Sequence, residues 1–409
     1  MMITDKKHIV VLGGGYGGMM AALRLAGKSK RLTTTVTLVN ALDYFVERPR
    51  LHEQATGVQL KNRSMAYMLR GTKVDFVQGW VTAIDPGQQV VRVRTAQDDK
   101  PLRYDYLVNA LGSHVDRETV PGVADYAFTL DPYGERTTTP LQQKLTAFGQ
   151  RSFQVVVVGG GATGIETATQ IKGVYPHSTV TLVTQGQAGA FKGPQIQQHM
   201  IQALREQSIH VCEYQSVTRV NSDSVVLASG WLPADVVVWA GGFMASPLAK
   251  EAGLQVNRRH QILVDPYLRS LSHPNIYAVG DAAWPVEEPG APMRMSLFTA
   301  LVSGAQAADN IMAEIKDQSP RPLSFAYYGQ GIALGPQDAV GFATYPADAA
   351  WKLIFRRKSA VAIRNFFIWL LGGVLEMERR FPGFFFWNGR ERYNKQRRRG
   401  AIAKSRATN

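Results

Sequence analysis

Two stretches of the chain repeat the same order of apolar and polar positions. His8 to Leu12 and Gln154 to Val158 are short apolar runs, each followed by a cluster of glycines and then by a segment rich in helix-forming residues. Such an order predicts a strand, a tight turn and a helix. After each helix comes another run of β-branched residues, at 35–39 and at 179–183. The sequence therefore predicts two βαβ units of one design, each with a parallel crossover.

Both glycine clusters have the spacing of a dinucleotide-binding turn, GGGYGG at residues 13–18 and GGGATG at residues 159–164. In such a turn one glycine reverses the chain, a second lets a pyrophosphate approach bare backbone, and a third lets the helix pack on the strand. The phosphate then faces the N-terminus of the helix. The glycines expected to contact the cofactors are Gly13, Gly14, Gly15, Gly17, Gly18, Gly159, Gly161 and Gly164.

The acidic residue that usually binds a ribose at the end of the second strand is absent from both units. Asn40 stands there in the first unit, where its amide can still hydrogen-bond a ribose hydroxyl. Thr184 or Gln185 stands there in the second unit, so no carboxylate repels a 2′-phosphate. No arginine lies at 184–190 to bind that phosphate, and Lys192 is the nearest cation. We therefore expect NADH or NADPH, without a choice between them.

Charge separates the end of the chain from the rest. The whole chain has 46 Lys and Arg against 32 Asp and Glu, and 15 of these cations but only 3 of the acids lie in residues 351–409. Within 351–387, aromatic and aliphatic clusters alternate with arginines, which suits a segment lying on an anionic membrane surface. Packing on the body or in a homodimer is the alternative. No nucleic-acid partner is expected, because no binding module accompanies the basic residues around 397–399.

Other sequence features bear on the redox chemistry and the location of the protein. A single cysteine, Cys212, excludes a redox-active cysteine pair, so two-electron chemistry requires a bound cofactor; no metal is expected. The N-terminus runs into a strand without a signal-peptide pattern, which predicts a cytoplasmic protein. No spanning helix is expected, because Arg364 interrupts the best apolar stretch, 359–375. We expect a peripheral protein on the inner face of the cell membrane.

Several further segments resemble those of the pyridine-nucleotide-disulfide oxidoreductase superfamily. YAVGDA at 277–282 resembles its second flavin motif, and YLVNALG at 106–112 resembles the crossing between its two nucleotide domains. The stretch 44–57 resembles the segment beside FAD in type II NADH dehydrogenases, and GIE at 164–166 is similar to their Gly-Val-Glu at the nicotinamide site. The resemblance implies FAD at the first turn and NADH or NADPH at the second. The further residues expected at the cofactors are Arg48, Val81, Gly112, Gly241, Gly280 and Asp281.

Glu166 is the candidate catalytic residue. One turn into the second helix, its carboxylate could hold the nicotinamide carboxamide or relay a proton, and a simple helix-start acid is the alternative. Arg48 could place a cation near the flavin or form a surface ion pair. A catalytic role for His52 is less favoured, and Trp239 is better explained by core packing than by stacking on a cofactor.

The chain departs from type II NADH dehydrogenases where electrons leave the flavin. Their Ala-Gln-x-Ala-x-Gln helix falls on residues 297–302 without its glutamines, and their lysine in a Tyr-x-x-Lys-Gly setting aligns with Gln330. The resemblance implies hydride transfer from NAD(P)H to FAD and then to a quinone-like acceptor at the membrane surface. A reductase of a soluble electron-carrier protein and a nucleotide-sensing flavoprotein with little turnover remain the alternatives.

The expected fold is α/β, with two Rossmann-like dinucleotide-binding domains, the second inserted in the first, and a C-terminal extension. The FAD-binding domain is expected in two parts, 1–115 and 265–325. The NAD(P)-binding domain is expected at 116–264. A C-terminal interface or membrane-surface region is expected at 326–409.

Overall fold

The computed structural model describes residues 6–29, 34–286, 293–387 and 389. Its first sheet is parallel throughout, in the order β19-β7-β1-β2-β3. The central position of β1 comes from the run of apolar residues that the sequence predicted as a strand. The strands are β1 (Lys7–Leu12), β2 (Thr34–Asn40), β3 (Val74–Gln78), β7 (Tyr106–Asn109) and β19 (Ile276–Ala278).

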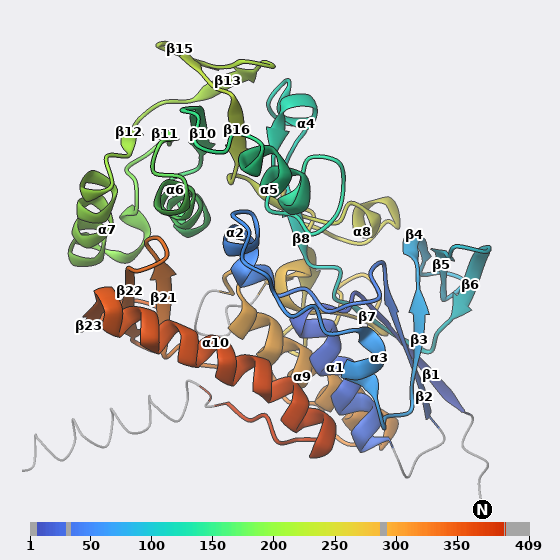
Figure 1. Ribbon diagram of the computed structural model, residues 1–409. Coiled ribbons are helices and arrows are strands. Elements are labelled where there is room, and N and C mark those ends of the chain that lie inside the picture. The colour runs from blue at the N-terminus through green and yellow to red at the C-terminus, as the bar shows by residue number, and fades with distance from the viewer. Residues whose placement is uncertain (1–5, 30–33, 287–292, 388, 390–409) are drawn as a thin grey trace, which may run out of the picture.

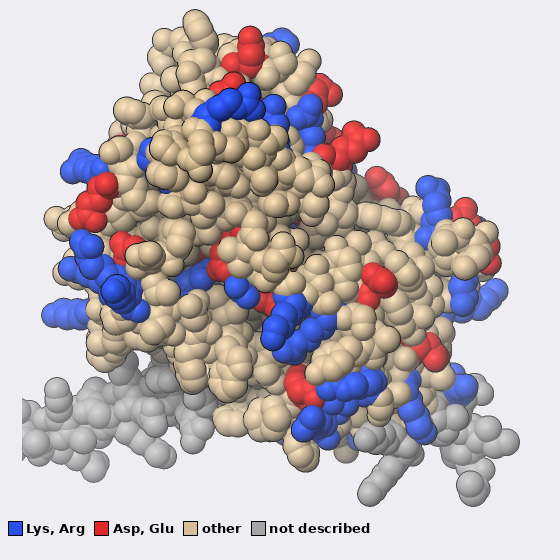
Figure 2. Space-filling view, viewed as in Figure 1, with Lys and Arg blue, Asp and Glu red and all other residues tan. Residues whose placement is uncertain are grey.

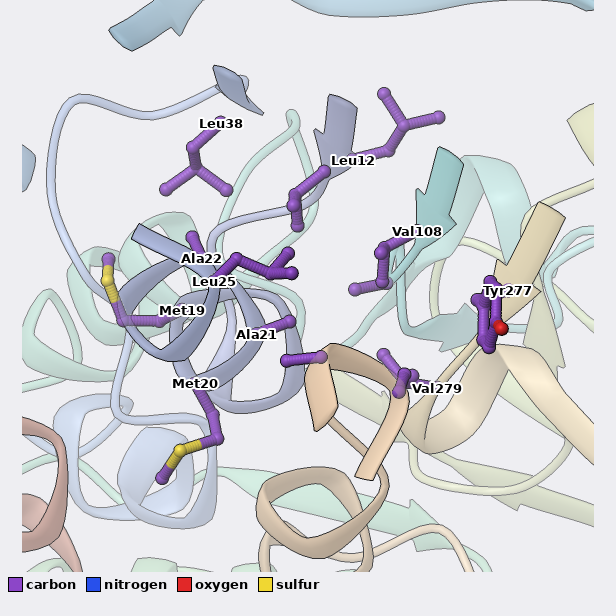
Figure 3. Packing of buried hydrophobic residues seen from close by; sticks show 14 of the residues in the cluster. Leu12, Met19, Met20, Ala21, Ala22, Leu25, Leu38, Val108, Tyr277 and Val279 are labelled. Atoms are coloured by element: carbon purple, nitrogen blue, oxygen red, sulfur yellow. The ribbon is translucent and has the colours of Figure 1, made fainter. Parts of the chain in front are cut away.

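Two helices cover this sheet and cross each other closely (Figure 1). A Cβ added at Gly304 would lie 2.2 Å from the carbonyl oxygen of Gly17, so this close approach of the helices requires glycine at position 304. Figure 3 shows Met19, Leu25 and Tyr277 among the side chains of this core. The helices are α1 (Tyr16–Lys28) and α9 (Leu297–Ile315), with the shorter η1 (Arg48–Arg50), α2 (Leu51–Gln54) and α3 (Met65–Leu69) nearby in the chain. A side sheet holds β4 (Trp80–Asp85), β5 (Val90–Arg94) and β6 (Asp99–Arg103).

The second sheet repeats the parallel arrangement in the order β12-β11-β10-β16-β9. Its strands are β9 (Ala127–Phe128), β10 (Gln154–Val158), β11 (Thr179–Val183), β12 (His210–Cys212) and β16 (Val236–Trp239). Its helical elements are α4 (Val123–Tyr126), α5 (Thr138–Thr146), α6 (Ala162–Val174), η2 (Ala190–Lys192) and α7 (Pro194–Glu206). An antiparallel sheet of β13 (Val217–Val220), β14 (Ser224–Leu227) and β15 (Gly230–Pro233) lies at the far end (Figure 1).

The chain enters and leaves the second unit through two paired crossing strands, β8 (Ser113–Val115) and β17 (Phe243–Ala245). It then returns to the first sheet, where β19 pairs with β7. This return confirms the predicted fold, in which the second Rossmann-like unit is inserted in the first; the exact domain boundaries stay a prediction. The returning segment also contains α8 (Leu248–Glu251), β18 (Ile262–Val264), η3 (Gly280–Ala282) and β20 (Ala283–Pro285).

The C-terminal region is an antiparallel sheet followed by a long helix that lies along the body in front of α1 and α9 (Figure 1). Its elements are β21 (Gly329–Ala333), β22 (Ala339–Thr344), β23 (Ala350–Arg356) and α10 (Arg357–Arg380). Among the described helices, α10 is long and apolar enough to cross a membrane, judged by length and composition alone, although it contains Arg364. The helix continues through Arg364, since arginine is a good helix former, and the Arg364 side chain turns toward the body. The basic residues around 397–399 lie outside the described part of the chain.

Candidate active site

The first glycine turn joins β1 to α1 and leaves one glycine facing open space. Gly13 has a φ of +96°, and a Cβ there would lie 2.3 Å from the carbonyl oxygen of Ala110. At Gly18 a Cβ would lie 1.8 Å from the carbonyl oxygen of Gly13, so the helix could not pack on the turn. Gly15 instead has no atom within 4 Å of an added Cβ. The turn thus has a bare backbone surface at the N-terminus of α1, as a pyrophosphate site requires.

Asn40, at the end of β2, forms a hydrogen bond with the backbone of this turn. Its Oδ1 accepts a hydrogen bond from the backbone N–H of Gly14 at 2.8 Å, and its Nδ2 donates to the carbonyl of Leu42 at 2.8 Å. Gly14 and Gly17 have packing roles, because an added Cβ would lie 2.6 Å from Met65 and 3.2 Å from the carbonyl of Ala300, respectively. Binding of a ribose by Asn40 remains a prediction.

The second glycine turn has the same geometry between β10 and α6. Gly159 has a φ of +129°, and a Cβ at Gly164 would lie 1.8 Å from the carbonyl oxygen of Gly159. Gly161 corresponds to Gly15 and has open space around it. Thr184, at the end of β11, packs under the turn, where a Cβ at Gly160 would lie 2.4 Å from its Oγ1. The two units therefore present equivalent surfaces to two dinucleotides.

Residues expected beside the flavin meet where β7 and β19 end. Ser113 donates a hydrogen bond from Oγ to Asp281 Oδ2 at 2.6 Å, and Arg48 donates to the carbonyl of Ser113 at 2.6 Å. Gly112 and Gly280 have φ values of +72° and +60° in the turns that bring these segments together. Arg48 also lies 3.7 Å from the buried Asp131, although its own side chain is 34% exposed, and a role beside the flavin stays a prediction.

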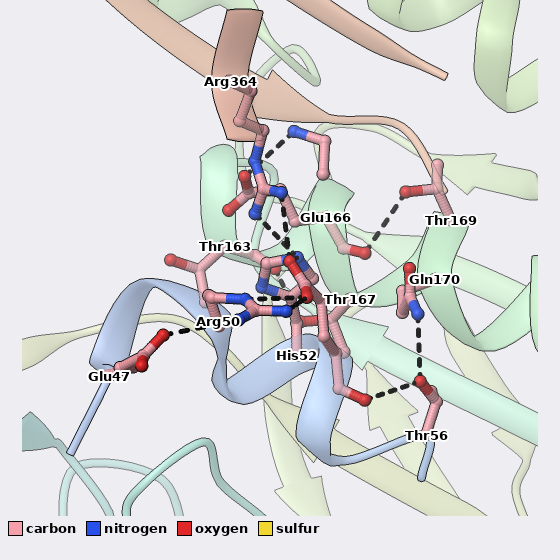
Figure 4. Close-up of polar contacts among 12 residues, drawn as sticks. Glu47, Arg50, His52, Thr56, Thr163, Glu166, Thr167, Thr169, Gln170 and Arg364 are labelled. Atoms are coloured by element: carbon pink, nitrogen blue, oxygen red, sulfur yellow. Dashed lines mark hydrogen bonds and ion pairs between the residues drawn. The ribbon is translucent and has the colours of Figure 1, made fainter. Parts of the chain in front are cut away.

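Glu166 lies partly buried in the first turns of α6, amid charged residues from three other segments (Figure 4). The backbone N–H of Ala333 donates to its Oε1 at 3.0 Å. Burial raises the pKa of Glu166 to about 7, although the charge of Arg364 and the Ala333 hydrogen bond act in the opposite direction. A carboxyl group with this pKa can both hold and release a proton at neutral pH.

The charged residues around Glu166 include His52, Glu53 and Arg50. Burial and the charge of Arg364 lower the pKa of His52 to about 3, so this ring stays neutral and does not act as a base at neutral pH. For Glu53 burial favours the neutral form, but the hydrogen bond from Arg50 and the charge of Arg364 outweigh it and lower its pKa. Glu53 is therefore a carboxylate beside Glu166.

The comparison with known proteins agrees with this site, which has two equivalent glycine turns, an aspartate near the crossing and a partly buried glutamate at the second turn. Residues 7–307 match the pyridine nucleotide-disulphide oxidoreductase family. The chain belongs to this family. The predicted class, a flavoprotein that uses FAD and a nicotinamide dinucleotide, is thereby confirmed.

Similar proteins of known name or structure support this assignment. An NADH dehydrogenase-like protein of Mycobacterium tuberculosis is 30% identical over 357 residues, which cover 81% of this chain and 87% of the relative. A demethylphylloquinone reductase of Synechocystis is 28% identical over 358 residues, which cover 83% and 87%. The sulfide:quinone oxidoreductase of Aquifex aeolicus shares the fold, with a TM-score of 0.75 and 21% identity over 90% of this chain and 92% of that chain.

The described residues of this oxidoreductase fit both cofactors. Open space at Gly15 and at Gly161 leaves room for one pyrophosphate at each turn. Asp281 lies at the end of β19, where it can bind a polar part of the flavin cofactor. Val81 in β4 and Gly241 after β16 are placed in their predicted segments, and their contacts with cofactors remain predictions. No group of three or more potential metal ligands occurs among the described residues.

A cleft of about 530 Å³ lies between α10 and the segment that contains α2. One part of its lining is charged or polar and includes Arg50, Glu53, Gln170 and Arg364. The rest is largely apolar and includes Phe45, Met68, Val361, Ile368 and Trp369. Ala333, whose N–H binds Glu166, also lines this cleft, so the cleft reaches the immediate surroundings of the candidate catalytic residue.

Some residues have partners that the sequence did not reveal. Lys192 forms an ion pair with Asp348 at 2.6 Å and is largely buried, so it is not available for a 2′-phosphate. Gln330 accepts a hydrogen bond from Arg294 at 2.5 Å. Trp239 is in the apolar core of the second unit, which confirms the packing explanation. Sequence analysis missed Ser113 and Arg364 as site residues, because their partners lie 168 and 311 positions away.

Proposed function

We propose that the protein is a membrane-surface NADH dehydrogenase that passes electrons through FAD to a quinone-like acceptor. The observation that carries the proposal is the cleft under α10, which joins an apolar wall to the charged surroundings of Glu166. When bound, FAD takes up a hydride from the nicotinamide and passes on two electrons. A quinone needs both electrons and protons to become a quinol, so an apolar entrance beside a proton-exchanging group suits this acceptor.

The chain's own residues bind, orient and exchange protons. The two glycine turns hold the dinucleotides by backbone N–H groups. Asp281 orients the flavin end of the dinucleotide that binds at the first turn. Glu166 is protonated below about pH 7 and ionised above it, so it can exchange a proton during turnover. The packing of α10 over the cleft limits water near this group, which strengthens the electrostatic interactions there.

The outer face of α10 supports docking on a membrane. Phe366, Phe367 and Trp369 are at least half exposed, and the side chain of Trp369 is 71% exposed. Figure 2 shows cationic side chains gathered near both ends of α10, with a largely uncharged band between them. Arg356, Arg357 and Lys358 lie at its start, and Arg379 and Arg380 at its end. Each cation near an anionic surface contributes roughly 1 kcal/mol.

Contacts between α10 and the body favour a helix that lies on the membrane over one that crosses it. Arg364 and Glu376 bind Glu53 and Arg70 on the body at 3.0 and 2.9 Å. Crossing a bilayer would break these ion pairs and place charged groups in hydrocarbon, at a cost of several kcal/mol. The relative named a demethylphylloquinone reductase adds support for a quinone as the acceptor.

The test separates the two half-reactions by stopped flow. The oxidised holoenzyme is first reduced with NADH or NADPH and then mixed with a short-chain quinone. Gly372→Phe should block reoxidation by quinone at least about tenfold, while reduction by NADH stays unchanged, because Gly372 lines the cleft and has open space around it. Ala362→Phe is the matched control, since Ala362 is exposed on the same helix. Equal reoxidation in both variants, or no reaction with any quinone, would contradict the proposed acceptor.

A further inference from the structure

Arg364 of α10 extends its side chain into the candidate active site. Its neighbours Asn365, Phe366 and Phe367 are exposed, whereas the side chain of Arg364 is only 11% exposed. Its stem passes over β21 at Gly331, where an added Cβ would lie 3.4 Å from Arg364 Cβ and Cγ. The stem of Arg364 is thus within van der Waals reach of β21, and the guanidinium extends inward past it.

The guanidinium of Arg364 binds residues of α2 beside Glu166 (Figure 4). Its Nη1 donates to Glu53 Oε1 at 3.0 Å, and its Nη2 lies 3.5 Å from Nε2 of the neutral His52. Glu53 Oε2 is held separately by Arg50, at 2.7 and 2.9 Å. Each oxygen of the Glu53 carboxylate thus has its own cation, and Arg364 is the one that α10 supplies.

The groups that act on Glu166 come from each segment packed against it. From α10, the positive charge of Arg364 lowers the pKa of Glu166, and from α2, the negative charge of Glu53 raises it. The Ala333 N–H from β21 favours the carboxylate, whereas burial of Glu166 favours the neutral acid. His52 is neutral, as its low pKa requires. Without Arg364, the carboxyl groups of Glu166 and Glu53 would lie near each other with one positive charge fewer to balance them.

We propose that Arg364 is a positioning residue of this centre, which holds the Glu53 carboxylate and balances the charge around Glu166, so that α10 forms part of the active site. The proposal rests on the proposed function only in assigning a role in turnover to proton exchange by Glu166. A proton released from Glu166 passes to solvent in the cleft, whose lining includes Arg364 and Glu53. The centre therefore depends on the position of the helix that faces the membrane.

A purely structural role for Arg364 would make a different prediction. Arg357 also ties α10 to the body, through an ion pair with Glu206 at 3.2 Å, but that pair is largely exposed and does not face Glu166. If Arg364 served only to anchor the helix, its replacement would change stability and leave the titration of Glu166 as it is. Arg357→Gln is thus the matched control for Arg364→Gln on the same helix.

The experiment is an infrared pH titration of the oxidised holoenzyme, following the carbonyl band of protonated buried carboxyl groups. Glu166→Gln identifies the band that belongs to Glu166, which in the native protein should lose intensity as pH rises through about 7. Arg364→Gln should raise this midpoint by about one pH unit or more, because an opposite charge has been removed. Arg364→Lys keeps the positive charge and should bring the midpoint most of the way back to its native value. Arg357→Gln should leave the midpoint unchanged.

Glu53→Gln gives an independent test with the opposite sign. Removing the negative charge of Glu53 should lower the midpoint of Glu166, and this variant decides the matter if Arg364→Gln does not fold. A midpoint that moves in neither Arg364→Gln nor Glu53→Gln would overturn the proposal. The band reports on the resting protein without any acceptor, so failure of the quinone hypothesis leaves this result intact and is distinguished from it.

Discussion

Arg24 in α1 and Glu378 in α10 form a buried ion pair that joins the first nucleotide-binding unit to the end of the chain. Arg24 Nε and Nη2 lie 2.7 and 3.0 Å from the two carboxylate oxygens, and the side chains are 2% and 0% exposed. Glu378 also accepts hydrogen bonds from the backbone N–H groups of Gly383 and Phe385 at 2.7 and 2.9 Å. Arg24 donates to the carbonyl of Phe385. The pair therefore fixes α10 and the segment after it on α1.

Glu378→Gln should lower the free energy of unfolding by about 3 kcal/mol or more, because it leaves the guanidinium of Arg24 buried with less opposing charge. Urea unfolding followed by circular dichroism measures the change. Glu206→Gln is the control, since Glu206 pairs with Arg357 in an exposed position and should cost less than about 1 kcal/mol. Equal losses in the two variants would mean that the buried pair has no special role.

Substitutions in the glycine turns should separate cofactor binding from folding. Gly15→Val should give a folded protein without FAD, because a side chain there would occupy open space needed by the pyrophosphate and meets no protein atom. Gly18→Val should instead disrupt folding, since its Cβ would collide with the carbonyl of Gly13. Flavin absorbance and circular dichroism of both purified variants distinguish these outcomes. A yellow, folded Gly15→Val protein would contradict the assignment of the first turn.

NADH and NADPH should reduce the flavin at rates within about tenfold of each other, or about 1.4 kcal/mol in transition-state free energy. No carboxylate follows β11, and Lys192 is bound to Asp348. Gln185→Asp should move the preference toward NADH by about tenfold, because the exposed carboxylate would repel a 2′-phosphate. Lys192→Met should leave the NADH to NADPH ratio of kcat/KM unchanged, whereas a selective loss with NADPH would show that this lysine binds the phosphate.

If α10 lies on the membrane as proposed, Trp369→Ser should weaken binding to anionic vesicles and remove the part of the binding that resists salt, because the exposed indole would insert into the interface. Trp231→Ser is the matched control, since Trp231 is 67% exposed on β15, far from α10. Vesicle co-sedimentation at low and high salt measures both variants. If both bind like the native protein, the exposed face of α10 is a protein contact instead of a membrane contact.

Local sequence signals were sufficient for the two nucleotide-binding units. The strands β1, β2, β10 and β11 occur within about one residue of their predicted bounds, because alternation, apolar runs and glycine spacing act over a few neighbouring positions. The C-terminal antiparallel sheet was not predicted. The pairing of β21, β22 and β23 depends on contacts between segments whose own patterns are weak.

The sequence by itself determined the two turns, their order and the place of Glu166 one turn into the second helix. Only the tertiary structure decided the charge of Glu166, because its pKa depends on burial and on Arg364 and Glu53, which come from distant parts of the chain. It also paired Lys192 with Asp348 and turned the side chain of Arg364 from α10 toward the body. Electrostatic effects of this kind depend on distance in space and on exclusion of water, and neither can be read from the spacing of residues along the chain.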